Sequence, residues 1–186
     1  ALDGTIGRPK ADVLAERVRA INAACRVTVV KSFYRTTNSD ELLQPAFDYV
    51  IDAIDGVTPK AHLIASCKQR GLRVITCGGS GGKRDPQQIR IKDLATTHTD
   101  RLLFFVRKKL RHEYGFPAKG PFHVPCVHSP EHVFVAAGCH DDATDDPFTG
   151  GTKLNCEGGL GAATFVTGAF GFHAAGHVVN ELAIPR

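Results

Sequence analysis

Apolar residues recur at helical spacing in three parts of the chain. The first pattern begins at Pro9, a good first helical residue, and predicts an amphipathic helix that packs on a sheet. The second begins at Asp100, and its stripe predicts a helix with a basic outer face that carries Arg101, Lys108, Arg111 and His112. The third, GLGAATFVTGAFGFHAAGHVVNEL, predicts a long helix of small residues that ends before Pro185.

Short apolar runs between these patterns predict strands. Residues 26–33 predict a strand, residues 47–54 a nearly all-apolar strand, and residues 72–77 a third, buried strand, as is typical of a parallel sheet. Residues 87–94 alternate and predict a more amphipathic strand. Residues 127–136 predict another strand, at an edge or with a bulge because of Pro130.

Helical segments separate the first three predicted strands. Ser39 is expected to cap a short helix, while Thr58 and Pro59 open a longer one that Gly71 closes. This alternation predicts an α/β fold with a Rossmann-like open, mostly parallel sheet and flanking helices. We expect residues 1–186 to form a single domain, with residues 138–153 as a flexible acidic surface loop.

The composition indicates a class of protein but does not identify a binding partner. The 186 residues are 42% hydrophobic and 23% charged, which is typical of a globular protein with a real core. A net charge of +4 suits an anionic partner without requiring one. The six cysteines are widely spaced and several lie in apolar patterns, which favours packing in a reducing compartment over a disulfide framework.

Two acids end a predicted strand, at the place where open α/β sheets bind ligands. Asp52 and Asp55 could hold the magnesium ion of a nucleotide, or they could cap the next helix and bond to turn amides. Lys10 lies in a first helical turn, where it could face phosphate or remain a solvated charge. The glycines of 78–82 fit no phosphate-loop pattern and are expected to let the chain turn tightly beside a substrate.

Other candidate ligands are more simply explained by packing. His173 and His177 lie one helical turn apart without a third ligand, and Cys126 and Cys156 have no local feature that would activate a thiol. The acidic residues 140–146 could bind calcium, although their spacing is not that of an EF-hand.

Two blocks carry a resemblance to a known family. The sequence GRPKADVLAERVRAIN and the run from YVIDAID through the glycines together resemble the ubiquitin-activating-enzyme-like (ThiF/MoeB/HesA) adenylating family. The resemblance implies ATP and Mg²⁺ as cofactors. It implies that Asp55 holds magnesium and ATP in catalysis, that Lys10 contacts the ATP phosphates and that Phe33 borders the adenine pocket. Asp52 matches the first acid of the family's Asp-x-x-Asp pattern, for which the resemblance implies a structural role.

The resemblance covers the later part of the family's domain. The family's Gly-x-Gly-x-x-Gly loop, ribose-binding acid and phosphate-contacting arginine precede the residues that match this chain. We therefore expect the N-terminal βαβ unit to be absent from this chain, and we expect these 186 residues alone to be inactive.

Three further features indicate a branch of the family. The chain contains no Cys-x-x-Cys pair for zinc, and DPQQIRIKDLATTHTD and CVHSPEHV, with the closing helix, resemble the tRNA-modifying dehydratases. The implied activity is ATP-dependent dehydration (cyclisation) of threonylcarbamoyladenosine in tRNA through carboxylate adenylation. Arg101, Lys108 and Arg111 are the candidates for tRNA binding.

The resemblance also implies a homodimer and leaves open a sulfur-transfer partner protein and peripheral membrane contact. The expected location is the cytoplasm, or the mitochondrion if the source is a eukaryote. Two other functions stay open at this point. One is adenylation of the C-terminus of a ubiquitin-like sulfur carrier, and the other is a non-catalytic α/β subunit that binds a partner protein.

Overall fold

The computed structural model describes residues 2–44, 47–134 and 161–184, which form two compact units. The first unit is Ala1–Arg35 and the second is Thr36–Arg186. The prediction of a single domain over residues 1–186 stays a prediction. The acidic segment 138–153 lies outside the described residues.

The first unit contains one helix, α1 (Lys10–Ile21), where the sequence pattern predicts it. Pro9 directly precedes the helix with a φ of −57°, and an ion pair joins Lys31 to Asp12 on the helix at 2.8 Å. The strand predicted over residues 26–33 is wrong, because these residues join no β-ladder. A strand needs a hydrogen-bonded neighbour, and among the described residues no segment pairs with this one.

The second unit is built on a four-stranded sheet of order β1-β2-β4-β3. Strands β1 (Val50–Asp52), β2 (Val74–Cys77) and β4 (Pro125–His128) run parallel, and β3 (Arg90–Asp93) pairs antiparallel with β4. The predicted α/β fold with an open, mostly parallel sheet is confirmed.

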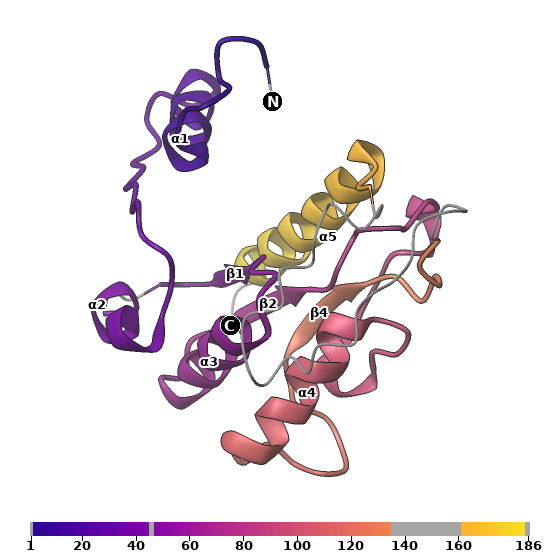
Figure 1. The fold of residues 1–186 in the computed structure, drawn as a ribbon. Helices are drawn as coiled ribbons and strands as arrows, with labels where there is room; N and C mark the ends of the chain where they lie inside the picture. Colours follow the sequence, from indigo (N-terminus) through magenta and orange to yellow (C-terminus); the bar gives the residue numbers. More distant parts are fainter. Residues whose placement is uncertain (1, 45–46, 135–160, 185–186) are drawn as a thin grey trace. The chain divides into compact units, whose positions relative to one another are not determined.

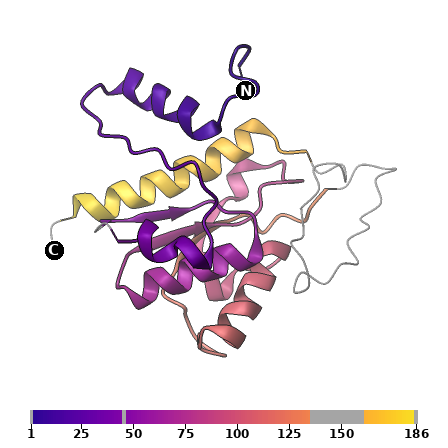
Figure 2. The same ribbon diagram turned by 60° about the vertical axis from the view of Figure 1, so that its left-hand side comes forward.

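Helices cover both faces of this sheet (Figure 1). Helices α3 (Val57–Gln69) and α4 (Arg101–Glu113) pack together on one face, and α5 (Thr164–Ala183) crosses the other. Figure 2 shows the same three layers from a second direction. The predicted end of α3 is confirmed: Gly71 follows the helix with a φ of +68°, a conformation that glycine adopts without strain.

Short elements complete the connections of the second unit. They are η1 (Thr36–Asn38), α2 (Ser39–Leu42), η2 (Pro86–Gln88) and η3 (Leu94–Thr96). The short helix α2 is where it was predicted, but its N-cap is Asn38, and Ser39 is its first residue. The Ser39 hydroxyl instead donates to the carbonyl oxygen of Thr36 at 3.0 Å.

The strand predicted over residues 127–136 is misplaced. The ladder of β4 runs from Pro125 to His128, so it ends before Pro130, and β4 lies between β2 and β3 instead of at an edge. Proline is tolerated at Pro125 because the first residue of a strand can lack an N–H donor. Residues 131–134 have no regular structure, and the last two positions of the predicted strand lie outside the described residues.

The apolar core lies on both sides of the sheet. On the α5 side, sheet residues such as Ile75 and Val127 pack against Val166, Phe170 and Ala174 of the helix. Burial of this kind is the main source of stability in a small α/β domain, at roughly 25 cal/mol per Å² of apolar surface. The core fixes the strands firmly, so the residues at their ends hold defined positions.

Candidate functional site

The candidate site lies where the parallel strands end. Strands β1, β2 and β4 run in the same direction, so their last residues, Asp52, Cys77 and His128, reach the same edge of the sheet. Open α/β sheets bind ligands outside this carboxyl edge. The residues that follow each strand therefore border the edge where a ligand would bind.

Asp52 is the centre of a buried network. Its Oδ2 accepts hydrogen bonds from Lys60 Nζ at 2.8 Å and from Thr76 Oγ1 at 2.7 Å, while Oδ1 accepts the N–H of Ile54 at 3.0 Å. Both side chains of the Asp52–Lys60 ion pair are completely shielded from solvent. A buried charge persists only when it is paired and hydrogen-bonded. Asp52 therefore ties β1, β2 and α3 together, which is the structural part that the resemblance implied.

Asp55 has the opposite surroundings. It lies in the loop between β1 and α3, its side chain is exposed, and α3 begins at Val57 directly after the N-cap Gly56. Among the described residues its carboxylate forms no salt bridge. The exposed carboxylate is a hard oxygen ligand of the kind that Mg²⁺ takes beside nucleotide phosphates, so the residue fits a magnesium role.

The glycines after β2 turn against the start of α4. A Cβ on Gly78 would lie 2.4 Å from Oδ2 of Asp100, so no other residue fits there without a shift. Asp100 Oδ2 accepts the N–H of Gly79 at 2.8 Å, and its Oδ1 caps α4 by accepting the N–H of Leu103 at 2.9 Å. The tight turn expected for this segment is confirmed. The sequence pattern predicted the helix start at Asp100 but not its second bond to the glycine turn.

Lys83 and Glu131 form a clamp that holds the far end of the glycine turn. Gly82 has a φ of +68°, and Lys83 after it is buried and donates from Nζ to the carbonyl oxygen of Glu131. The Glu131 carboxylate accepts the backbone N–H groups of Arg84 and Asp85, and these bonds lower the pKa of Glu131. The sequence carries no local signal for this clamp, because its two halves are 46 to 48 residues apart.

Three cysteines of the second unit, Cys67, Cys77 and Cys126, behave as packing residues, whereas Cys25 in the first unit is exposed. Burial raises the pKa of Cys67 to about 11, raises the pKa of Cys77, and raises that of the fully buried Cys126 further. All three thiols are therefore protonated at neutral pH, which does not suit a nucleophile. Cys156 lies outside the described residues.

The two histidines of α5 also pack without a metal site. His173 donates from Nδ1 to the carbonyl oxygen of Ala169 at 2.8 Å, and His177 bonds through Nε2 to the Tyr49 hydroxyl at 3.2 Å. Within the described ranges, no group of three or more metal-binding side chains comes together. The acidic candidates at 140–146 fall outside those ranges.

The three predicted ATP contacts belong to different units. Lys10 is the first residue of α1 and is exposed, and Phe33 lies in irregular structure in the same unit. Asp55 belongs to the second unit. The roles of all three residues, and their convergence on one nucleotide, stay predictions.

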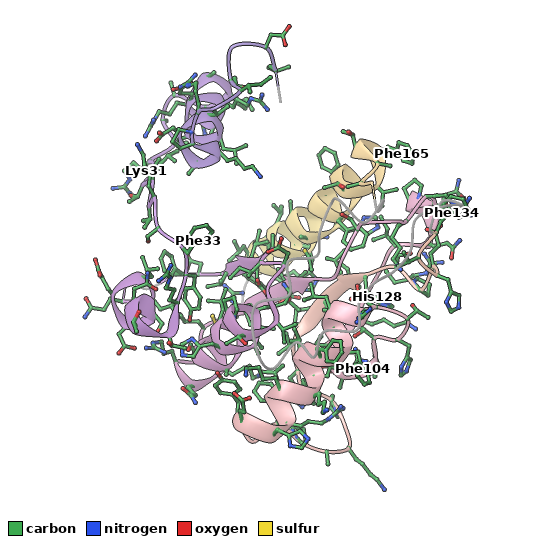
Figure 3. The ribbon with its side chains drawn as sticks, in the orientation of Figure 1. Lys31, Phe33, Phe104, His128, Phe134 and Phe165 are labelled. Carbon is green, nitrogen blue, oxygen red and sulfur yellow. The ribbon has the colours of Figure 1, made fainter. Side chains whose placement is uncertain are left out.

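The predicted tRNA-binding residues lie on one face of α4. Arg101 and Lys108 are seven residues apart, and Arg111 is three further on, so they share the outward side of the helix. The Arg111 guanidinium lies 5.0 Å from the ring centre of Phe122. Lys108 and Arg111 also line a pocket of about 390 Å³ with Ala95, His98, Phe104, Arg107 and His112. The sequence patterns did not single out Phe104, which lines the same pocket from α4 and is 53% exposed. Figure 3 shows this residue on the helix.

None of the helices in the described part of the chain combines the length and the apolar content that crossing a bilayer requires.

Comparisons with known proteins agree with the geometry. The chain is 42% identical to the tRNA threonylcarbamoyladenosine dehydratase of Haemophilus influenzae and 41% identical to that of Escherichia coli. Both matches cover 98% of this chain, and they cover 68% and 69% of the two relatives. The chain thus spans about two thirds of the length of these proteins.

Solved structures give the same result. The crystal structure of the Escherichia coli dehydratase in complex with ATP matches 98% of this chain and 67% of its own, with a TM-score of 0.81 at 39% identity. The complex of that enzyme with AMP matches with a TM-score of 0.83 at 40% identity.

A family model gives the assignment. The ThiF family model matches residues 2–121, which include α1, the Asp52–Lys60 network, the glycine turn and α4. Because this match spans more than half of the chain, the chain belongs to the ThiF family.

Proposed function

We propose that this chain is part of an ATP-dependent enzyme that dehydrates threonylcarbamoyladenosine in tRNA by activating its carboxylate. The names of the two bacterial relatives and the ATP complex of the related structure support this activity. The observation that carries the proposal is the exposed carboxylate of Asp55 beside the buried Asp52–Lys60 pair, at the ligand-binding edge of the sheet.

The proposed chemistry has two steps and balances without an enzyme nucleophile. A carboxylate oxygen of the substrate attacks the α-phosphorus of ATP, the bond to pyrophosphate breaks, and an acyl adenylate forms. The substrate's own carbamoyl group then loses a proton and attacks the acyl carbon. AMP leaves with the former carboxylate oxygen, so the substrate has lost the elements of water. The protonated thiols of Cys67, Cys77 and Cys126 agree with this route.

Each candidate residue has one task in this proposal. Lys10 binds the ATP phosphates, Phe33 contacts the adenine, and Asp55 holds magnesium beside the phosphates. When bound, Mg²⁺ neutralises charge on the triphosphate and its developing leaving group. Asp52 positions the strand end through its bonds to Lys60 and Thr76.

The finer points of partner and place belong to the same proposal. The cations of α4 bind tRNA phosphates, and the functional enzyme is a homodimer in the cytoplasm that receives its substrate as modified tRNA. Light scattering on the full-length protein tests the dimer directly. A sulfur-transfer partner is not needed for the two steps.

The test of the activity compares two acids that flank β1 in the full-length protein. Asp55→Asn should lower tRNA-dependent AMP release roughly 100-fold or more, the scale of removing one preorganised electrostatic group. Asp48→Asn is the matched control, because Asp48 is exposed and precedes the strand at the opposite edge of the sheet. Both variants should unfold at the wild-type temperature.

Near wild-type AMP release by Asp55→Asn would remove the residue from the mechanism. AMP release that depends on a ubiquitin-like carrier protein and not on tRNA would replace the proposal with its sulfur-carrier alternative.

A further inference from the structure

The outer face of α4 contains a concave site as well as a row of cations. The pocket of about 390 Å³ lies between η3, which contributes Ala95, and the exposed side of α4. This volume falls within the ~300–1,000 Å³ typical of pockets that bind small molecules, so it suits one nucleotide and not a double helix.

Five of its seven lining residues are basic, and none carries a carboxylate: the basic ones are His98, Arg107, Lys108, Arg111 and His112. Two acids lie at the ends of α4: Asp100 is buried and already bonded to Gly79 and Leu103, and Glu113 forms an ion pair with Lys109. The pocket therefore presents a positive surface to any ligand, and an anion is the complementary partner.

Arg107 is held in place at the inner wall. Its side chain is nearly buried, and its Nη1 donates to Thr97 Oγ1 at 2.7 Å. Burial and the neighbouring Arg111 cation both lower the pKa of Arg107, while Asp100 acts in the opposite direction. These two cations repel each other, and an anion bound in the pocket reduces that repulsion.

Phe104 adds an aromatic surface to these charges. Its ring is 53% exposed, although Leu103, Val106 and Leu110 on the same helix are buried in the core. The ring meets Phe105 edge-on, with ring centres 5.2 Å apart. A duplex offers a protein mostly phosphates, whereas an unpaired nucleotide offers both a phosphate and a base that stacks on an aromatic ring.

We infer that this pocket holds a single unpaired nucleotide of the RNA substrate, with the base on Phe104 and a phosphate between Lys108 and Arg111. The inference rests on the proposed function, and it implies that the α4 pocket recognises a single-stranded loop of the RNA. Figure 3 shows Phe104 on α4, in the second unit.

The test uses the full-length protein, a labelled RNA hairpin with a seven-nucleotide loop, and a fully paired RNA of equal length. Fluorescence anisotropy without ATP gives the affinities. Phe104→Leu should weaken hairpin binding roughly 5- to 150-fold, the scale of removing one base stack, and leave duplex binding unchanged. Phe104→Trp should restore the hairpin preference.

Charge and stacking should separate in a salt series. Lys108→Gln should reduce the slope of log affinity against log salt by about 0.7 for the hairpin, and Phe104→Leu should not change it. The matched controls are Phe165→Leu, an exposed phenylalanine on α5, and Lys68→Gln on α3, and both should bind like wild type.

Three outcomes would overturn the inference. If Phe104→Leu binds the hairpin with wild-type affinity, no base stacks on Phe104. If the variant loses affinity equally for hairpin and duplex, Phe104 has a structural role. If AMP alone binds and loses affinity in the same variants, the occupant is a free nucleotide. If the wild-type protein binds no RNA at all, the proposed function fails as well. If it binds RNA and only the Phe104 effect is missing, the proposed function stands.

Discussion

Lysines occur in two opposite environments in the second unit. Lys60 on α3 is completely buried, and its ammonium donates to Asp52 at the end of β1. Lys108 on α4 is exposed and lines an open pocket beside Phe104 and Arg111. Both residues lie on 13-residue helices on the same face of one sheet. Their burial differs because Lys60 points towards the sheet and Asp52, whereas Lys108 lies on the outer side of its helix.

The difference separates the charges that hold the fold from those that can bind a ligand. A buried ammonium must keep its partner, because an unpaired charge in the interior costs several kcal/mol. An exposed ammonium contributes little to the free energy of unfolding, so its main effect is expected when a phosphate binds. Stability should therefore respond to changes at the strand ends, and RNA affinity to changes on the face of α4.

The largest effect on stability is expected from Lys60→Met. The variant leaves the Asp52 carboxylate buried with no cation, so the free energy of unfolding should fall by about 3–5 kcal/mol. Urea denaturation followed by circular dichroism measures this, with Lys68→Met on the exposed end of α3 as the control. Adding Asp52→Leu to Lys60→Met should recover much of the loss, because the double variant buries no charge. An unchanged midpoint for Lys60→Met would show that the pair does not hold β1 to α3.

Sequence patterns predicted the elements whose signals are local. The apolar stripes gave α1, α4 and α5, and the Gly71 stop and the Asp100 cap are where the sequence places them. These features depend on spacing within a few residues, which a single sequence displays directly. The mostly parallel sheet followed from the alternation of strands and helices.

Pairing and burial could not be predicted in the same way. Residues 26–33 have the composition of a strand, but a strand exists only if another segment pairs with it. The position of β4 depends on its ladders with β2 and β3, which local composition does not reveal. The Asp52–Thr76 bond and the Lys83–Glu131 bond join residues that are 24 and 48 positions apart in sequence. Of the candidate site, the sequence therefore predicted individual residues but not their partners.

A smaller effect on stability is expected from His128, the buried last residue of β4. Among the described residues neither ring nitrogen of His128 has a hydrogen-bond partner, and the side chain is 3% exposed. Burial lowers the pKa of His128, and the cations of Lys92, Lys83 and His98 add to this while Asp100 opposes it. The folded state therefore holds this proton less well than the unfolded chain does.

Because the unfolded chain binds this proton more tightly, the free energy of unfolding falls as the pH drops below the unfolded pKa of about 6.5. The loss is at most about 1.4 kcal/mol per pH unit. His128→Phe removes the proton and should flatten the loss between pH 6.5 and 5, as measured by thermal melts. His132→Phe, at an exposed histidine, is the control. A wild-type pH dependence in His128→Phe would place the titrating group elsewhere.

The smallest effect on stability is expected from Lys108→Gln. This variant tests directly whether exposed and buried lysines have separate roles in RNA binding and in stability. Lys108 is exposed on α4, so the free energy of unfolding should change by no more than about 0.5 kcal/mol. The same substitution should still weaken RNA binding, because fewer counterions leave the RNA when one cation fewer neutralises its phosphates. Denaturation and RNA titration on one preparation measure both. A destabilisation close to that of Lys60→Met would mean that the α4 cations also hold the fold. The division between structural and ligand-binding charges would then fail.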